Sequence, residues 1–226
     1  MIPDLDWSRF KAVLFDVDGT LYDQPQLRKI MAMELAGWCF FHPFRWREAK
    51  ILATFRRLRE EYFEREEPSL LEAQYRWTAE AVGVSADQVR RIADEWLLAR
   101  PLRHLGRCRP DGLVELFDRL RSQKIKIGVF SDYPAQEKLD ALGLNAHAVA
   151  CALDPHINRL KPHPAGLMHL CERLEVLPDA CLHIGDREDR DAVCAERCGC
   201  ESLVLPAHRA RAAGRARSYD RLFPTT

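Results

Sequence analysis

The sequence predicts an α/β protein in which a doubly wound parallel sheet is interrupted, after its first strand, by an all-helical insert. Two observations support this fold class. From about residue 110 onward, short apolar runs alternate with amphipathic segments, which is the pattern of parallel strands covered by helices on both faces. Residues 24–100, by contrast, have helical periodicity and many charges, and they show no strand signal.

The first strand is predicted over residues 12–15, after a short lead-in. These residues are apolar, partly β-branched and followed directly by a turn sequence. Asp16 and Asp18 come next, and at the end of an extended segment their spacing places both carboxylates on the same side of the chain, before a tight turn at Gly19. Two acids held this close need a cation or a proton between them, so they either contribute to a metal site or are solvated loop residues.

The insert is predicted as four helices. Residues 26–41 form the first and residues 46–65 the second, which has Glu and Arg at spacings of three to four residues, as in an exposed helix. Ser69 and Ser85 each begin a further helix, because Glu or Gln follows three residues later in the capping-box position. The last of these helices is predicted to end before Pro101.

The remaining predicted elements alternate along the chain. The helices are predicted over residues 111–122, 134–142, 164–174 and 189–197, and the strands over residues 125–130, 148–153, 181–184 and 203–205. Ligands of such sheets bind beyond the carboxyl ends of the strands. Because Asp16, Ser131 and Asp186 each follow a predicted strand, we expect them to converge on one site.

Composition excludes several classes of partner. The chain has 226 residues, enough for one substantial domain and a smaller insert, and its 34 basic and 34 acidic residues balance, so nucleic acid is not an expected partner. No apolar run approaches the roughly 18 residues of a membrane span. Residues 1–10 lack the features of a signal peptide, so we expect a cytoplasmic protein. The Arg-rich residues 208–226 are predicted to dock as a short helix or to stay loose.

The eight cysteines are expected to be reduced, because the chain shows no export signal. Cys194, Cys198 and Cys200 form the tightest group, and the first two share a helical face. No further Cys or His pair lies nearby at the spacing usual for zinc, so we interpret the three as structural thiols.

Three later positions carry candidate chemistry. Ser131 can donate its hydroxyl to an anionic oxygen, although a helix cap or a turn residue is the alternative. Lys161 precedes two prolines on a stiff, extended backbone that would hold its charge in place. Asp186 follows a strand and offers an oxygen ligand of the kind that Mg²⁺ prefers. Asp191 can orient the surrounding loop, or it can simply favour the start of a helix.

The set of motifs resembles that of the haloacid dehalogenase-like (HAD) hydrolases. Residues 16–21, DVDGTL, resemble motif I of this superfamily when they directly follow an apolar strand. Ser131 resembles motif II, Lys161 with the proline after it resembles motif III, and Asp186 with Asp191 resembles motif IV, all in the family's order. The resemblance covers nearly the whole chain outside the insert and the tail.

The resemblance implies a domain organisation and an activity. The core would be a Rossmann-like HAD domain of residues 1–22 and 106–226, and residues 23–105 would form the helical C1 cap. The implied activity is that of a Mg²⁺-dependent phosphatase, which hydrolyses a small-molecule phosphate monoester through an aspartyl-phosphate intermediate. The cap would select the substrate, because the core motifs contact only the phosphoryl group.

The resemblance also implies residue roles. Asp16 would attack phosphorus, and Asp18 would donate a proton to the departing oxygen and later accept one from water. Ser131 and Lys161 would hold the phosphoryl oxygens.

The implied metal site takes its ligands from motifs I and IV. Mg²⁺ would bind the Asp16 side chain, the Asp18 main-chain carbonyl and Asp186, with Asp191 in a supporting position. Two positions depart from the family's common pattern. Asp132 stands where Asn or Gly is frequent, and Arg187 stands where a small hydroxyl residue is frequent, so both are expected to affect substrate preference.

The most unusual part of the predicted cap is the aromatic segment 38–46. It either forms cap core with an interhelix loop at Pro43, or presents an apolar surface near the mouth of the site to a bulky or lipid-linked phosphate or to a partner. Arg28, Arg45 and Arg47 are candidate anion contacts.

Three alternatives to a phosphatase follow from the same residues. A phosphotransferase or sugar-phosphate mutase is the nearest, since the same motifs serve both reactions. A haloacid dehalogenase is disfavoured, because that branch does not require the second Asp and the Mg²⁺ cluster. A non-catalytic binding domain is disfavoured by the retention of Asp16, Asp18, Lys161 and Asp186 together.

Overall fold

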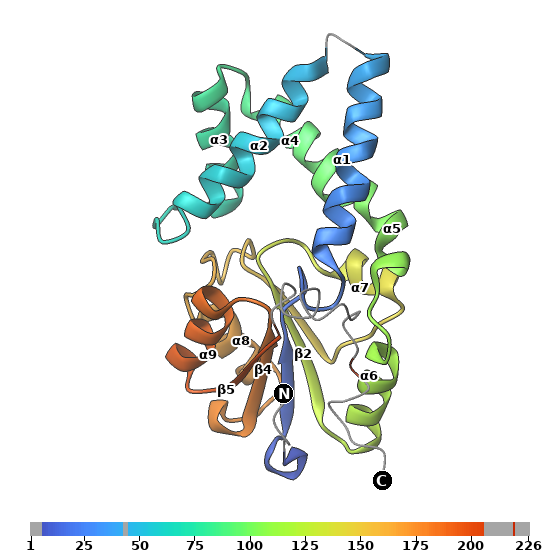
Figure 1. Cartoon of the computed structure of the whole chain (residues 1–226). Coiled ribbons are helices and arrows are strands. Elements are labelled where there is room, and N and C mark those ends of the chain that lie inside the picture. The colour runs from blue at the N-terminus through green and yellow to red at the C-terminus, as the bar shows by residue number, and fades with distance from the viewer. Residues whose placement is uncertain (1–5, 43–44, 206–218, 220–226) are drawn as a thin grey trace.

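A five-stranded parallel sheet forms the centre of the protein in the computed structural model, which describes residues 6–42, 45–205 and Tyr219. The order of its strands is β3-β2-β1-β4-β5, and all neighbours pair in parallel (Figure 1). This arrangement confirms the predicted parallel sheet. The strands are β1 (Ala12–Phe15), β2 (Lys126–Ser131), β3 (Ala148–Cys151), β4 (Cys181–Gly185) and β5 (Glu201–Val204).

Helices cover both faces of this sheet, because alternate residues of the central strand β1 serve separate cores. Val13 and Phe15 pack into one apolar cluster, and the Phe15 ring stacks on Phe117 with ring centroids 4.9 Å apart. Ala12 and Leu14 pack into the other. All of β1 is buried, as expected of a parallel strand with a helical layer on each side. The helices of the sheet domain are α6 (Leu113–Ser122), α7 (Gln136–Leu142), α8 (Ala165–Arg173) and α9 (Val193–Cys198).

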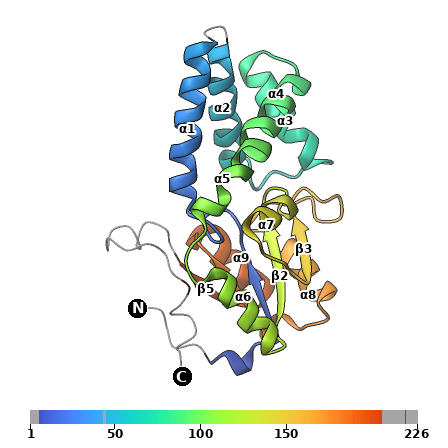
Figure 2. The same ribbon diagram turned by 90° about the vertical axis from the view of Figure 1, so that its right-hand side faces the viewer.

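The insert between β1 and β2 is helical, as predicted, and lies beyond the carboxyl ends of the strands (Figures 1 and 2). Ser69 and Ser85 accept hydrogen bonds from the N–H groups three residues on, at 3.4 and 3.2 Å, which confirms both predicted caps. The helices of the insert are α1 (Gln24–Phe41), α2 (Trp46–Glu61), α3 (Leu70–Val82), α4 (Ala86–Ala93) and α5 (Arg100–Cys108).

The predicted end of the last insert helix before Pro101 is wrong. A π-helical turn, η3 (Asp94–Ala99), continues α4 directly into α5, which begins at Arg100. Pro101 is the second residue of α5, which follows this π-helical turn directly, and such turns are local irregularities at which a helix continues past a residue without an N–H. After α5 the chain returns to the sheet domain. The segment that enters the insert and the segment that leaves it are linked by a hydrogen bond, in which the Asp23 N–H donates to Cys108 O at 2.7 Å.

The described residues of the aromatic segment lie at the end of α1 and the start of α2, on the part of the insert remote from the sheet (Figure 1). Phe40, Phe41 and Trp46 are 80%, 77% and 60% exposed, so they are not cap core, whereas Trp38 is half-buried and packs near Trp96. An 18-residue helix such as α1 spans about 27 Å, so this surface is far from the strand ends rather than near the mouth of the site. A partner at this surface stays a prediction.

Two sequence predictions lie largely outside the described residues. Pro43 is one of these positions, and of residues 208–226 only Tyr219 is described. The Tyr219 side chain is buried, and its hydroxyl donates to Thr20 O at 2.8 Å. Among the described residues, no helix combines the length and apolar character needed to cross a bilayer.

Candidate active site

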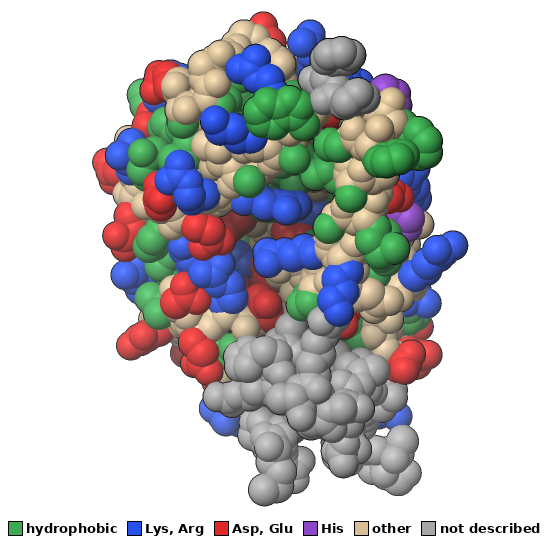
Figure 3. Space-filling view, turned by 45° about the horizontal axis from the view of Figure 1, so that its top comes forward, with side chains coloured by type: hydrophobic (Ala, Val, Ile, Leu, Met, Phe, Trp, Pro, Cys, Tyr) green, Lys and Arg blue, Asp and Glu red, His purple; other side chains and the backbone are tan. Residues whose placement is uncertain are grey.

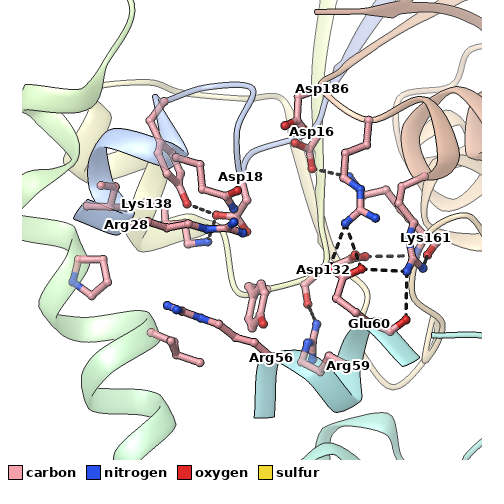
Figure 4. Close-up of a pocket in the computed structure, with 18 of the residues that line it drawn as sticks. Asp16, Asp18, Arg28, Arg56, Arg59, Glu60, Asp132, Lys138, Lys161 and Asp186 are labelled. Carbon is pink, nitrogen blue, oxygen red and sulfur yellow. Dashed lines mark hydrogen bonds and ion pairs between the residues drawn. The ribbon is translucent and has the colours of Figure 1, made fainter. Parts of the chain in front are cut away.

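The site forms at the carboxyl edge of the sheet, where the sequence places its candidate acids. Asp16 directly follows β1 and Asp186 directly follows β4, while Asp191 lies in the π-helical turn η5 (Glu188–Ala192). Carboxylate oxygens of these three residues lie within 4.8 Å of one another. They line a cavity of about 600 Å³ between the sheet domain and the insert (Figure 4).

Asp16 is buried at the centre of this cluster. It accepts hydrogen bonds from Lys161 Nζ and, at 2.9 Å, from Thr20 Oγ1. Burial raises the pKa of Asp16 to about 8; the Lys161 ammonium opposes this rise, and the Asp191 and Asp186 carboxylates add to it. The cluster therefore has more negative than positive charge, and a further cation would favour the ionised form of Asp16.

Gly19 allows the loop after β1 to approach Asp186. Its φ is +96°, a conformation that strongly favours glycine, and a Cβ at this position would lie 2.3 Å from Asp186 Oδ2. The glycine of the DVDGTL motif therefore provides both the turn and the close approach between the first and last acidic segments of the site.

Lys161 is the cation of the cluster. Its side chain is 3% exposed, and its Nζ contacts Asp16 and, at 2.8 Å, Asp191 Oδ1. Burial alone would lower the pKa of this lysine, but the Asp16 and Asp191 carboxylates outweigh burial and raise the pKa well above its ordinary value. Lys161 is therefore a fixed positive charge facing the Asp16 carboxylate.

Asp191 organises the loop that carries Asp186. One of its oxygens accepts the backbone N–H groups of Asp186 and Arg187 at 3.1 and 3.0 Å, and the other contacts Lys161 and His183. Burial opposes ionisation of Asp191, but Lys161 and His183 outweigh it and hold its pKa below the ordinary range. This geometry fits the predicted orienting function.

Asp18 is held apart from the three clustered carboxylates (Figure 4). It accepts hydrogen bonds from Tyr22 and, at 2.5 Å, from Lys138 Nζ on α7. Burial raises its pKa, but the Lys138 ammonium and the hydrogen bonds from Lys138 and Tyr22 outweigh burial and lower the pKa overall. The sequence analysis did not identify Lys138. Its position four residues before Leu142 places this charged residue on the apolar face of α7, and such a position could have indicated a buried, paired lysine.

The family follows from comparison with known proteins. The sequence matches the haloacid dehalogenase-like hydrolases over residues 10–199. The chain belongs to this family. A comparison with curated proteins gave no significant match.

Several solved structures share its fold. A 2-haloacid dehalogenase from Pseudomonas syringae is 22% identical, covers 94% of this chain and 91% of its own, and has a TM-score of 0.61. A β-phosphoglucomutase from Clostridium difficile is 18% identical; the match covers 95% of this chain and 93% of the mutase, with a TM-score of 0.62. A magnesium-bound HAD hydrolase from Bacillus subtilis is 17% identical; the match covers 87% of this chain and 89% of the hydrolase, with a TM-score of 0.59. At these identities the likeness shows the shared fold, in which the helical insert occupies the place of the C1 cap.

The HAD motif II residue, Ser131, is present but covered in this structure. It ends β2, is fully buried, and its Oγ accepts the Tyr133 N–H at 3.2 Å. Ser131 does not line the cavity, whereas Lys161 does. The Ser131 hydroxyl is therefore not exposed to the cavity in this structure, and its phosphate-binding role stays a prediction.

The two departures from the common HAD pattern serve contacts within the protein. Asp132 Oδ1 accepts the Lys161 backbone N–H at 3.1 Å, and the Asp132 carbonyl oxygen accepts Arg59 of the cap at 2.7 Å. Arg187 pairs with Glu60 of the cap at 2.9 Å and with Asp189 at 2.8 Å. The charge of Arg187 is thus compensated by two carboxylates, whereas burial raises the pKa of Asp132 and favours its neutral form. Both residues connect the HAD core to its cap.

Two arginines of the cap line the cavity, and one of them, Arg28, lies beside Asp18 and Lys138 (Figure 4). Arg28 of α1 and Arg56 of α2 line it, and neither forms an ion pair or hydrogen bond with the described residues (Figure 4). Burial lowers the pKa of Arg56. Lys and Arg side chains gather in the hollow between the two parts of the HAD fold (Figure 3). Of the other predicted anion contacts, Arg45 pairs with Glu48 at 2.8 Å, and neither it nor Arg47 lines the cavity.

Proposed function

We propose that the protein is a Mg²⁺-dependent phosphatase, which hydrolyses a small phosphate monoester through an aspartyl-phosphate. The observation that carries this proposal is the cluster of three carboxylates around one buried ammonium at the floor of the cavity. Such a cluster suits a hard divalent cation, because Mg²⁺ takes oxygen ligands. Asp16 and Asp186 would hold the ion, together with the Asp18 carbonyl, and Asp191 would orient their loop.

The residues of the chain divide the proposed reaction between them. The Asp16 carboxylate is the nucleophile, and Thr20 and Lys161 fix its orientation. Bound Mg²⁺ would reduce the repulsion between this carboxylate and an anionic substrate. Lys161 and Ser131 are the residues proposed to hold the phosphoryl oxygens.

Asp18 is the proposed proton-transfer residue. Because Lys138 and Tyr22 keep it ionised in this structure, Asp18 must leave this ion pair and take up a proton before it can donate to a leaving oxygen. We retain the proposed division into a core of residues 1–22 and 106–226 and a cap of residues 23–105, whose boundaries lie close to the two connections at Asp23 and Cys108.

The test of this function is hydrolysis of a panel of phosphate esters with Mg²⁺ and with chelator. The panel comprises a generic chromogenic ester, sugar phosphates, nucleotides and phosphoglycolate. We expect turnover that depends on Mg²⁺ and is lost in chelator. Absence of turnover on every ester, from folded protein that binds Mg²⁺, would contradict hydrolysis of small phosphate monoesters. Faster transfer of phosphate to an added sugar than to water would favour the phosphotransferase alternative.

The unpaired Arg28 and Arg56 support a further specification of the substrate. Two guanidinium groups on the cap side of a cavity whose floor binds a phosphoryl group suit a second anionic group on the substrate, such as a carboxylate or another phosphate. We therefore propose that the preferred ester carries two anionic groups, one at the acidic cluster and one beneath the cap.

Arg56→Ala tests this specification. We expect kcat/KM to fall about 10- to 100-fold for esters with a second anionic group, mainly through KM, because a hydrogen bond to a charged group is lost. Esters without such a group should change by no more than about twofold. The control is Arg47→Ala, on the same helix but outside the cavity. An equal fall for both kinds of ester would contradict a specific anion contact.

A further inference from the structure

A second cluster of candidate metal ligands lies at the opposite edge of the sheet. Cys171 of α8, Cys198 at the end of α9 and Cys200 before β5 place their sulfur atoms within 4.8 Å of one another. Cys181, the first residue of β4, lies beside this group, with its Sγ 3.8 Å from that of Cys171. Three thiols therefore form a tight group, and a fourth borders this group through Cys171.

One pair of these sulfur atoms already has the spacing of a tetrahedral thiolate site, and the others approach it. Four ligands placed about 2.3 Å from a zinc ion in a tetrahedron lie about 3.8 Å from one another. The separation of Cys171 Sγ and Cys181 Sγ equals this value, and Cys171, Cys198 and Cys200 need to approach one another by at most about 1 Å to reach it. Cys181 must also move toward Cys198 and Cys200, because the four sulfur atoms do not all lie within 4.8 Å of one another. We propose that Cys171, Cys181, Cys198 and Cys200 bind one structural Zn²⁺ ion.

Local structure explains how two of these ligands come together. Helix α9 ends at Cys198, and Gly199 follows in the left-handed region with φ +84°. This reversal at the helix end brings Cys200 back beside Cys198, and the Cys200 N–H donates to Ala195 O at 2.9 Å. The other two ligands come from α8 and β4, which is why spacing in the sequence does not reveal the set.

Burial indicates a closed site rather than a catalytic one. Cys171, Cys181 and Cys200 are 4%, 0% and 8% exposed, and only Cys198 is partly accessible. With four protein ligands no position is left for water, as in structural zinc sites. The ion would link α8, α9 and the starts of β4 and β5.

The cluster is also separate from the proposed magnesium site. Cys181 begins β4 and Asp186 follows its end, so the two lie at opposite edges of the sheet, about 13 Å or more apart along the strand. Cys194 is not part of the cluster, because its thiol donates to His163 O at 3.3 Å. The zinc proposal therefore does not depend on the proposed phosphatase activity.

Metal content tests the proposal. We expect protein purified without chelator from zinc-supplemented cells to contain about one zinc per chain, measured by plasma mass spectrometry. Cys200→Ser should lose this zinc, and the control Cys39→Ser, a partly exposed thiol in the cap, should keep it. Asp16→Asn should also keep it, which excludes zinc held at the acidic cluster. Full zinc content in folded Cys200→Ser would overturn the assignment.

Cobalt provides a test that does not rely on a substituted protein. Titration of reduced, metal-free wild-type protein with Co²⁺ should produce thiolate-to-cobalt charge-transfer bands and intense tetrahedral d–d bands, which reach a plateau at about one equivalent. Excess Mg²⁺ should leave these bands unchanged. Folded, reduced protein that shows no such bands would overturn the proposal, as would a Cys171–Cys181 disulfide, detected by mass, in the freshly isolated protein.

Discussion

Asp16→Asn is expected to abolish turnover, with a loss of at least about 10⁴-fold in kcat on the best ester of the panel. The amide has no anionic oxygen to attack phosphorus, and it also removes one of the three carboxylates proposed to attract Mg²⁺. Steady-state kinetics at saturating Mg²⁺ measures the loss. Near-wild-type activity in this variant would contradict the assignment of Asp16 as nucleophile.

Two controls separate loss of chemistry from loss of structure. Asp118→Asn makes the same chemical change at an exposed position on α6 and should retain full activity. Thermal unfolding of Asp16→Asn should show a folded protein, because an uncharged amide at a buried site avoids the burial cost that raises the pKa of Asp16. Acid-quenched wild-type protein should contain covalent phosphate after mixing with substrate, and the variant should not.

Lys161→Met is expected to have the second largest effect, on both activity and stability. The variant leaves the buried Asp16 and Asp191 carboxylates without their shared ammonium. We expect a loss of about 10³-fold in kcat/KM and a fall of about 3–5 kcal/mol in the free energy of unfolding in chelator. Lys50→Met, at an exposed position on α2, is the matched control.

The pH dependence identifies the cause of this instability. In the wild-type protein, burial opposes ionisation of Asp191, but Lys161 outweighs burial and lowers the Asp191 pKa. A carboxyl whose pKa is lower in the folded than in the unfolded protein stabilises the fold at pH values above its unfolded pKa. Without Lys161 the folded pKa rises, so the carboxyl takes up a proton at a higher pH. The stability deficit of Lys161→Met should therefore shrink as pH falls from about 8 to about 5, and Mg²⁺ should reduce it at pH 8. A deficit independent of pH and Mg²⁺ would indicate lost packing instead.

Local signals in the sequence were sufficient for most of the fold. The apolar run of β1 and the caps at Ser69 and Ser85 depend on neighbouring residues, so they could be predicted. The passage of the helix through Pro101 could not, because a π-helical turn accommodates the proline.

Within the site, the strand-end rule correctly placed Asp16 and Asp186 together. The partnership of Asp18 with Lys138 could not be predicted in this way, since 120 residues separate them and no pattern in the sequence connects the two. The same holds for Cys171 and Cys181, whose sulfur atoms meet only after α8 and β4 pack.

The hydrogen bond between the Asp23 N–H and Cys108 O has an evolutionary consequence. Because the start and the end of the inserted helices are joined by this hydrogen bond, the insert leaves the sheet domain at a single place, and β1 and β2 stay directly paired. Insertions whose ends lie close together are tolerated well by folded domains. A different helical module can therefore be joined at this point, which would change the surface above the acidic cluster while the strand ends that carry the cluster stay in place.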